Sequence, residues 1–550
     1  MVKKIMAFLL AAVMLASVLA GCGQGGNKPA EPGTGAPSST AAGAGGTVNA
    51  IMGEEPQTLD PAMNQSVDGG TYILHVFEGL TKVDKDGKTV PGIAEKWDVS
   101  ADGLKYTFHL RNAKWSDGKP VTAGDFEYAW KRALDPKTAS LYAFQLYYLK
   151  NGEAYNSDKA KAEDVGVKAV DDKTLEVTLQ NPTPYFLDLM HFPTYMPVRK
   201  DIIEQYKDQW TQKPETYIGN GAFKMKDWKH KEELVLEKNE NYWDKDKIQL
   251  KEIHWKLTSD DSAALNAFES GEIDFVNQFI PQAEQPNLIK EGKEKIYPMV
   301  GTYYLYFNTA RKPLNDVRVR KALALAIDRQ YICEKVTQRG EKPAVGVVPY
   351  NVPGSEAGKD FRSETGTYLP TTPNVEEAKK LLAEAGYPDG KGFPELEIYY
   401  NTMSSHKAIM EAIQEQWKTN LGITVKPPNM EWKVLQGMLD QKNFTIARMG
   451  WIGDYNDPMT FLDMWTTTSG QNKTNWSNKN YDQLIETAKK TADPKARWKA
   501  LDDAEKIFMD EVPACPIYYY VNQNLESPKL KGQITDMLGF IYMHYATIEK

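Results

Sequence analysis

Two patterns of apolar and polar residues divide the chain. From residue 47 to about residue 257, short alternating segments separated by turn residues predict mostly β-strands, as in residues 104–110 and 174–179. One clear helix is predicted within this part. Thr122 has the position of an N-cap, Asp125 follows three residues later, and apolar residues then recur at helical spacing until an Asp-Pro pair. This part of the chain is therefore expected to be rich in sheet.

From about Gly301 the pattern changes to alternating helices and strands. Apolar residues at four-residue spacing predict a helix over residues 315–336, and Asn374 has the position of an N-cap for the next one. The βαβ order predicts an α/β fold with a parallel sheet, in which ligands bind beyond the carboxyl ends of the strands. That places the candidate site just after Met449. The remaining predicted elements are helix 374–385, strand 396–400, helix 405–420, strand 423–426, helix 431–440 and strand 444–449.

The N-terminus has the features of an export signal. Lys3 and Lys4 precede an apolar stretch over residues 5–20, which is too short to span a membrane comfortably. The next residues complete the sequence Leu-Ala-Gly-Cys, which ends at Cys22 and resembles the lipobox of bacterial lipoproteins. The resemblance implies that residues 1–21 are removed and that Cys22 is acylated. The protein would then be extracytoplasmic and lipid-anchored to the outer face of the cell membrane, on the periplasmic side in a Gram-negative organism. The alternative is an ordinary signal peptide with an incidental cysteine.

Residues 22–47 are predicted to be a flexible linker after the lipid anchor. They consist almost entirely of small and polar residues, which bury too little apolar area to offset the entropy of ordering. A surface loop of the folded part is the alternative. The remaining residues, about 500, suffice for two or three domains. No later apolar run approaches the ~18 residues of a membrane span.

Composition and motifs exclude several classes of function. The net charge of -8, with Lys and Glu interleaved, argues against nucleic-acid binding. Zinc-protease, serine-hydrolase, phosphate-loop and Cys-x-x-Cys motifs are missing, and the seven histidines are scattered. We therefore expect no catalytic residue, metal site or cofactor, although an extracellular peptidase remains an alternative. Asp84 to Gly87 has half of a calcium-loop pattern but is better explained as a hairpin turn. Cys333 and Cys515 could pair, but two separate buried thiols are favoured.

The candidate site is the segment 447–458. If it is extended, Arg448, Gly450, Ile452 and Asp454 lie on one side, because side chains of a strand alternate. Arg448 and Asp454 are then about 20 Å apart at Cα. A zwitterion such as a tripeptide could place its ammonium on the aspartate and its carboxylate on the arginine. The glycines would leave the backbone open for strand-like pairing with that ligand. The alternative is that both charges pair with other protein side chains.

Ordered motifs from about Glu55 to the C-terminus carry a resemblance to one family. They are residues 57–61, 77–80, 94–97, 106–111, 114–126, 220–223 and 315–323. Through them the sequence is similar to the oligopeptide-binding proteins of bacterial ABC importers, within the extracytoplasmic peptide and nickel solute-binding proteins. The resemblance implies a periplasmic-binding-protein-like type II fold of two ligand-clamping lobes with a hinge, plus an extra third domain.

The same resemblance implies a domain plan and partners. Lobe I is expected to be discontinuous, the extra domain to cover residues 78–198, and lobe II to cover residues 301–521. The implied role is to capture short oligopeptides largely independently of sequence and to deliver them, as a monomer, to the membrane permease subunits of an ABC importer with cytoplasmic ATPases. Alternatives within the family are a dipeptide, a murein peptide, a peptide pheromone, a nickel chelate or haem. The segments of lobe I are 48–77, 199–300 and 522–550.

Individual site residues are also implied by the family motifs. Asp454 matches the aspartate that binds the peptide ammonium, while Arg448 and His406 match residues that meet the carboxylates of peptides of different lengths. Thr337 and Gln65 depart from the lysine and glutamate of some relatives, which weakens the case for dipeptides. His406 could instead merely open a helix. Trp432, Trp451, Tyr142, Tyr304 and Tyr520 fall at aromatic pocket positions, with Trp432 and Tyr520 alternatively core residues, and Val67 lies near a stretch that pairs with the ligand backbone.

Overall fold

A computed structural model describes residues 46–53, 55–356, 358–491 and 493–549. The predicted signal peptide, the lipidation residue Cys22 and most of the predicted linker lie outside these residues. Thr47, the predicted end of the linker, already belongs to the first strand, and the carbonyl of Gly46 accepts a hydrogen bond from the Lys251 amide. Within the described ranges, no helix is both long and apolar enough to cross a membrane.

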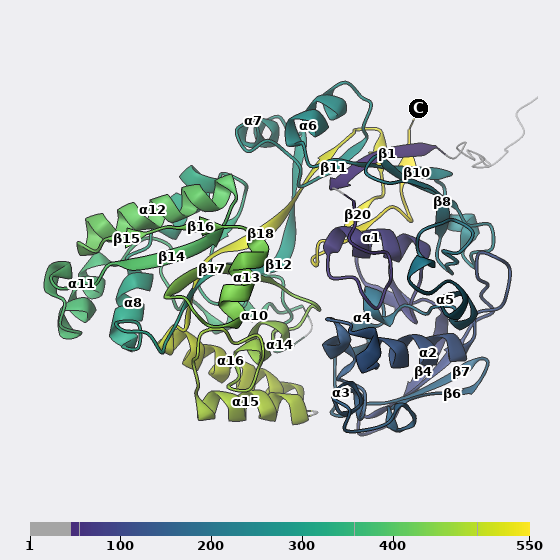
Figure 1. Ribbon diagram of the computed structural model, residues 1–550, viewed down its shortest axis with the longest axis horizontal. Helices are drawn as coiled ribbons and strands as arrows, with labels where there is room; N and C mark the ends of the chain where they lie inside the picture. Colours follow the sequence, from purple (N-terminus) through teal and green to yellow (C-terminus); the bar gives the residue numbers. More distant parts are fainter. Residues whose placement is uncertain (1–45, 54, 357, 492, 550) are drawn as a thin grey trace, which may run out of the picture. The chain divides into compact units, whose positions relative to one another are not determined.

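One twelve-stranded sheet contains strands from both halves of the sequence (Figure 1). Two long strands, β12 and β18, lie in its middle and pair with each other. Their neighbours on one side come from the C-terminal half, and those on the other side come from the N-terminal half. The order is β15 (Val425–Lys426), β14 (Leu396–Asn401), β17 (Ile446–Ile452), β12 (Glu294–Phe307), β18 (Ala514–Glu526), β11 (Phe275–Asn277), β1 (Thr47–Gly53), β10 (Glu252–Leu257), β9 (Glu233–Lys238) and β8 (Phe223–Lys229), with β13 (Lys342–Pro343) on β18 and β16 (Asn429–Met430) on β14.

The sheet is mixed, which corrects the expectation of a parallel sheet. β14 is parallel to β15, β16 and β17, as the βαβ order predicts. β12 is antiparallel to both β17 and β18. The βαβ order could not predict these pairs, because their strands lie far apart in the sequence. On the other side, β1 is parallel to β10 and β11. Two central antiparallel strands thus join two partly parallel groups.

Helices form where caps and apolar stripes predict them. Thr122 and Asp125 form the predicted capping box of α2. Asn374 accepts from the Glu377 amide at the start of α11. The apolar stripe of α12 is fully buried, and its Trp417 donates to the Leu323 carbonyl. The helices are α1 (Val67–Val76), α2 (Ala123–Leu134), α3 (Gly152–Asn156), α4 (Phe186–Leu189), α5 (Lys200–Tyr206), α6 (Asp261–Glu269), α7 (Gln285–Lys290), α8 (Val317–Leu325), α9 (Arg329–Tyr331), α10 (Phe361–Thr365), α11 (Val375–Glu384), α12 (Ser404–Leu421), α13 (Trp432–Asp440), α14 (Met459–Leu462), α15 (Lys479–Lys490) and α16 (Pro494–Glu511).

The predicted helix over residues 315–336 is wrong as a single element. α8 ends at Leu325, and a new turn begins where the Asp328 side chain accepts from the Tyr331 amide. A π-helix, Ile332–Thr337, follows. The apolar spacing continues through the break, but Asp328 satisfies backbone donors and so starts a second helix.

The helix α1 is absent from the sequence prediction. It contains Gly69 and Gly70, which lower helix propensity. The structure explains these glycines, because a Cβ at Gly69 would lie 2.2 Å from Asn64 Oδ1 and one at Gly70 would lie 2.5 Å from Phe540 Cε1. Close packing therefore outweighs the propensity.

A second, four-stranded antiparallel sheet lies within the predicted extra domain. Its order is β4 (Ala94–Val99), β5 (Lys105–Leu110), β7 (Thr174–Thr178) and β6 (Val167–Asp171). Next to it in sequence, the predicted hairpin turn at 84–87 joins β2 (Thr81–Val83) to β3 (Thr89–Pro91). Two further strand pairs form near the C-terminus, β19 (Leu530–Lys531) with β22 (Thr547–Ile548) and β20 (Ile534–Thr535) with β21 (Ile541–Tyr542).

The C-terminal segment packs on the N-terminal helix α1. The Ile541 amide donates to Thr71 Oγ1 at 3.2 Å, and the Met543 amide donates to His75 Nε2 at 3.1 Å. These contacts agree with a discontinuous first lobe, while the domain boundaries stay predictions. Cys333 and Cys515 are both buried and free, as expected.

Candidate functional site

Strand β17 places Arg448 on one face of the sheet together with three tyrosines. In the pairing of β12 with β17, Tyr303 lies opposite Gly450 and Leu305 lies opposite Arg448. Because opposite residues of paired strands share a face, Arg448, Gly450 and Tyr303 point the same way. Tyr518 and Tyr520 of β18 join them, with ring centroids 4.6 Å and 6.1 Å from that of Tyr303.

The guanidinium of Arg448 has only neutral partners. Nη1 donates to Asn401 Oδ1 at 3.1 Å, and Nη2 donates to the Tyr520 hydroxyl at 3.2 Å. The group also lies 4.8 Å from the centre of the Tyr303 ring, and its Nε is buried without a hydrogen-bond partner. Among the described residues, no carboxylate lies within 4.0 Å of it. The predicted alternative, that Arg448 pairs with an acidic side chain of the protein, is therefore not what the structure shows.

His406 lies in the first turn of α12 beside the same cluster. Its Nδ1 is 3.4 Å from the Tyr303 hydroxyl, and the side chain is buried. Burial first, and then the positive charges of Arg448 and Arg339, lower the pKa of His406 to about 3. The imidazole is therefore neutral at neutral pH and can offer a hydrogen bond, but no charge, to a ligand carboxylate.

Asp454 lies just beyond the end of β17. The Gly453 amide still bonds to the Val300 carbonyl of β12, whereas the Asp454 amide donates to Thr460 Oγ1 at 3.2 Å. The alternation of β17 therefore does not set the direction of the Asp454 side chain. The carboxylate is buried, and this burial, helped by the negative charge of Asp463, raises the pKa of Asp454 to about 7.

The acidic neighbours of Asp454 are paired, and Asp454 is not. Arg497 binds both oxygens of Asp457 at 2.8 Å. Lys489 lies 3.6 Å from Asp463. No cation of the described residues lies within 4.0 Å of the Asp454 carboxylate. A buried carboxylate without a partner is costly, so this group is the one in the cluster that a ligand cation would neutralise.

Around these two charges lie the other residues of the segment. Trp451 is half-buried and donates to the same Thr460 Oγ1 at 3.3 Å. Gly450 is required by packing, because a Cβ there would lie 2.2 Å from the Tyr520 hydroxyl. Ile452 and Trp432 are 37% and 38% exposed, which leaves both side chains able to contact a ligand.

Tyr304 is not brought to the face of Arg448. It is the neighbour of Tyr303 along β12 and so points to the opposite face, where its ring packs 5.6 Å from that of Trp465. Tyr303 and Tyr304 are both fully buried, so the two differ in the face of the sheet to which they point and not in exposure. Tyr303 and Tyr518 lie on the face of Arg448, and sequence reasoning named neither. Neighbouring residues of a strand point to opposite faces, so Tyr303 and Tyr304 cannot both lie on the face of Arg448. The sequence alone could have separated them only if the end of the strand had been located.

Tyr142 lies near Asp454, and Val67 packs on the C-terminal hairpin. The ring of Tyr142 stacks on Phe192 at 5.9 Å, and burial, together with the nearby Asp454 carboxylate, raises the pKa of Tyr142. Val67 is the first residue of α1, so the structure places it in a helix. It packs beside Gly539, at the tip of a hairpin that bonds to Val300.

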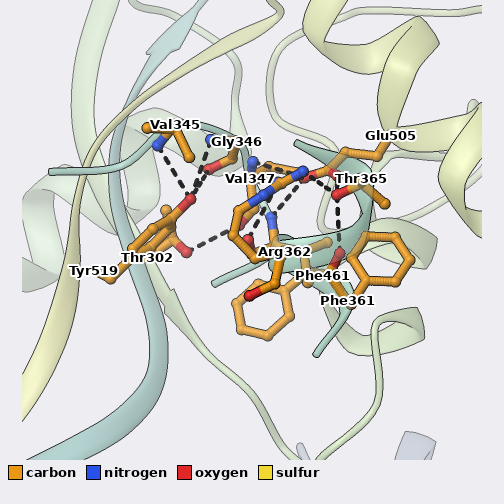
Figure 2. Close-up of polar contacts among 12 residues, drawn as sticks. Thr302, Val345, Gly346, Val347, Phe361, Arg362, Thr365, Phe461, Glu505 and Tyr519 are labelled. Carbon is orange, nitrogen blue, oxygen red and sulfur yellow. Dashed lines mark hydrogen bonds and ion pairs between the residues drawn. The ribbon is translucent and has the colours of Figure 1, made fainter. Parts of the chain in front are cut away.

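A buried ion pair supports the opposite face of the same strands (Figure 2). Glu505 pairs with Arg362 and accepts from the amides of Val347 and Val348 at 3.0 and 2.9 Å. The segment held in this way is tied to β18, because the Tyr519 hydroxyl accepts from the amides of Val345 and Gly346. It is also tied to β12, because Thr302 Oγ1 donates to the Val347 carbonyl. The two strands that carry Tyr303, Tyr518 and Tyr520 are thus fixed from behind.

The site offers complementary charges rather than reactive groups. Among the described residues, no group of three or more His, Cys, Asp or Glu side chains is arranged to hold a metal ion. Its chemistry is one buried anion, one cation with neutral partners, and aromatic and apolar surface between them.

Comparisons with known proteins identify the family and the fold. Residues 88–473 match the bacterial extracellular solute-binding proteins, family 5 Middle. The oligopeptide-binding protein OppA of Bacillus subtilis is 42% identical over 506 residues, covering 91% of this chain and 92% of that protein. The dipeptide-binding protein DppE of the same organism is 40% identical, covering 90% of each chain.

Solved structures show the same fold. The murein tripeptide-binding protein MppA of Escherichia coli superposes with a TM-score of 0.79 at 38% identity, covering 92% of this chain and 99% of that one. OppA of Listeria monocytogenes bound to peptide gives a TM-score of 0.77 at 31% identity, covering 92% and 99%. These likenesses confirm the expected type II binding-protein fold with an extra domain, and the family confirms a binding protein rather than an enzyme. This chain belongs to the family-5 bacterial extracellular solute-binding proteins.

Proposed function

We propose that this protein binds short peptides by their two charged ends. One observation carries the proposal: six residues apart, the segment 448–454 holds a guanidinium and a buried carboxylate, neither of which has an oppositely charged partner among the described residues. A peptide with a free ammonium and a free carboxylate supplies both missing charges. Charged hydrogen bonds shielded from water are the stronger ones, so both ends contribute to affinity.

The assignment of roles follows from the surroundings of each charge. Asp454 would bind the ammonium, because its paired neighbours Asp457 and Asp463 already have cations. Arg448 would bind the carboxylate, with Tyr520 and neutral His406 as further hydrogen-bonding groups. Ile452, Trp451 and Trp432 would line room for side chains.

The surfaces near the ligand favour a broad peptide specificity. Main-chain and terminal contacts do not depend on side-chain identity, and aromatic surfaces accept many side chains. Relatives whose names specify oligopeptides, dipeptides and murein peptides lie at similar identities, from 39% to 42%. Peptides of similar length and different sequence should therefore bind with similar affinity.

We further propose that the protein works as the lipid-anchored receptor of an ABC importer. Cys22 would carry the lipid, residues 22–45 would serve as the tether, and the folded part would deliver peptides to permease subunits as a monomer. The resemblance of the N-terminus to a lipobox and the names of the relatives support this role. The two lobes and the extra domain, with the boundaries predicted above, would close around the ligand.

The decisive experiment compares one peptide in three chemical forms. Calorimetric titration should show tight binding of a tripeptide with free ends, weaker binding of its N-acetylated form, and weaker binding of its C-amidated form. Mass spectrometry of the purified protein should also detect retained peptides. Equal affinity for the three forms would overturn recognition by the ends, and release of shortened peptides would support a peptidase.

A further inference from the structure

Three tyrosines join the predicted extra domain to the segment that follows Asp454. The rings of Tyr185 and Tyr455 stack with centroids 4.5 Å apart and planes 5° from parallel. Tyr148 meets both rings edge-on, at 5.6 Å from Tyr185 and 6.1 Å from Tyr455. Tyr148 and Tyr185 come from residues 78–198, whereas Tyr455 comes from the segment after β17. This stack therefore links two parts that are far apart in sequence.

An ion pair braces the stack. The guanidinium of Arg497 lies 5.4 Å from the centre of the Tyr185 ring and binds both oxygens of Asp457. Arg497 comes from α16, and Asp457 lies two residues after Tyr455. Tyr185 and Tyr455 are both buried. A cation over an aromatic ring stabilises the contact, more so when it is removed from water.

The stack includes the residue next to Asp454, whose carboxylate has no cation partner among the described residues. Tyr455 directly follows Asp454, and Tyr142, in the same segment as Tyr148, is close enough for the Asp454 charge to raise its pKa. The charged group that acts on Asp454 is Asp463, which pairs with Lys489, while Asp457 of the same segment pairs with Arg497 of α16. The Asp454 side chain is itself buried.

We propose that Tyr148, Tyr185 and Tyr455, braced by Arg497, form a latch that holds the extra domain over Asp454 and keeps the bound amino group out of water. The latch rests on the proposed function, since it acts through Asp454. Its tyrosines are positioning residues: they touch each other and set the environment of the carboxylate. Opening the latch would readmit water to Asp454 and weaken its hold on the ammonium. The latch should therefore control how fast peptide leaves, while entry through the open form stays unaffected.

The test compares Tyr185→Ala with Tyr185→Phe. The alanine variant loses two ring contacts and the ring under Arg497, so we expect peptide to dissociate roughly 10- to 100-fold faster. The association rate should change less than about twofold, because affinity differences among mutants of one site reside mostly in dissociation. Tyr185→Phe keeps the ring and should restore slow dissociation. Tyr331→Ala, at an exposed tyrosine, serves as the control. Stopped-flow fluorescence with a labelled tripeptide measures both rates.

A pH profile separates the latch from a general loss of structure. In the wild type, affinity should fall on acidification from about pH 7. In Tyr185→Ala, Asp454 is hydrated, so the fall should move toward the ordinary aspartate range near ~4. Tyr148→Ala, at a half-buried position, provides an independent variant should Tyr185→Ala fold poorly. A dissociation rate within twofold of wild type in folded variants, or an unmoved acidic limb, would overturn the latch.

Hydrogen exchange without peptide keeps the latch distinguishable from the proposed function. The amide of Asp454 bonds to Thr460, and we expect its exchange to accelerate in Tyr185→Ala but not in Tyr331→Ala. Unchanged exchange would contradict the latch whatever the ligand is. Binding of acetylated and free peptides with equal affinity would contradict end recognition, while faster exchange would still support the latch.

Discussion

The affinity for peptide should depend on pH through Asp454. Its pKa of about 7 in the ligand-free protein means that the carboxyl group is largely protonated at pH 5.5. The ammonium needs the ionised form, so binding must first remove that proton. Affinity should therefore fall about tenfold per pH unit below 7, which amounts to roughly 25-fold between pH 7.5 and 5.5. Above pH ~8 the peptide's own amine loses its proton, so affinity should peak between these limits.

Asp454→Asn tests this reasoning. The substitution keeps the shape and removes the charge, so at pH 7.5 a tripeptide should lose about 2 to 4 kcal/mol, or roughly thirtyfold to a thousandfold in affinity. The variant should also lose the acidic limb, because its amide does not titrate. This comparison isolates Asp454 from Glu294 and Asp536, whose pKa values burial also raises to about 7.

Calorimetry with a histidine-free tripeptide from pH 5.5 to 8.5 is the assay. N-acetylation of the peptide should abolish the pH dependence in the wild type. Acetylation and Asp454→Asn together should lose less than the sum of the two single losses, since both remove one interaction. The reasoning is refuted if wild-type affinity changes less than about threefold between pH 7.5 and 5.5, or if Asp454→Asn keeps the wild-type slope.

Three further substitutions test other parts of the structure. Arg448→Gln should weaken a free tripeptide roughly 10- to 100-fold in calorimetry and leave its C-amidated form unchanged, and an equal loss for both forms would show that Arg448 does not bind the carboxylate. Glu505→Gln leaves the fully buried guanidinium of Arg362 unpaired, so urea unfolding should show a loss of about 3 to 5 kcal/mol, and a loss under 1 kcal/mol would contradict the role of the pair. Both carboxylate oxygens of Glu294 are buried without a hydrogen-bond partner among the described residues, and burial raises the pKa of Glu294 to about 7. The folded state therefore favours the protonated form, and the free energy of unfolding falls as the pH rises through about 7. Glu294→Gln should therefore raise the unfolding free energy by about 1 to 3 kcal/mol at pH 8 but not at pH 4, unlike the exposed control Glu272→Gln, and no gain at pH 8 would show that Glu294 is not buried as a charge.

Several local features of this protein follow from sequence alone. The capping box of Thr122 and Asp125, the cap at Asn374 and the apolar stripe of α12 depend on groups a few residues apart. Hydrogen bonds and side-chain spacing over a few residues depend only on the local order of residue types, so the sequence predicts them. A strand at Arg448 was also predicted, over residues 444–449, from the alternation of helices and strands, and the structure has β17 over Ile446–Ile452.

Other features depended on contacts between distant segments. The glycine-containing helix α1 went against the local pattern, because close packing, as of Gly70 against Phe540, outweighed helix propensity. The break after Leu325 has a local cause, the cap at Asp328, which the continuous apolar spacing concealed. The choice between Tyr303 and Tyr304 depended on the register of β12 against β17, and a shift of one residue reverses every side chain of a strand.

The sequence by itself determined the class of fold, the family and the position of the two charges along the chain. Only the tertiary structure decided that Asp454 and Arg448 have no oppositely charged partner in the described part of the chain and that Tyr185 stacks on Tyr455. The physical reason is that burial and charge pairing depend on which distant residues meet. Asp454, Asp457 and Asp463 have the same side-chain chemistry until the fold brings Arg497 to Asp457 and Lys489 to Asp463, and leaves Asp454 for a ligand.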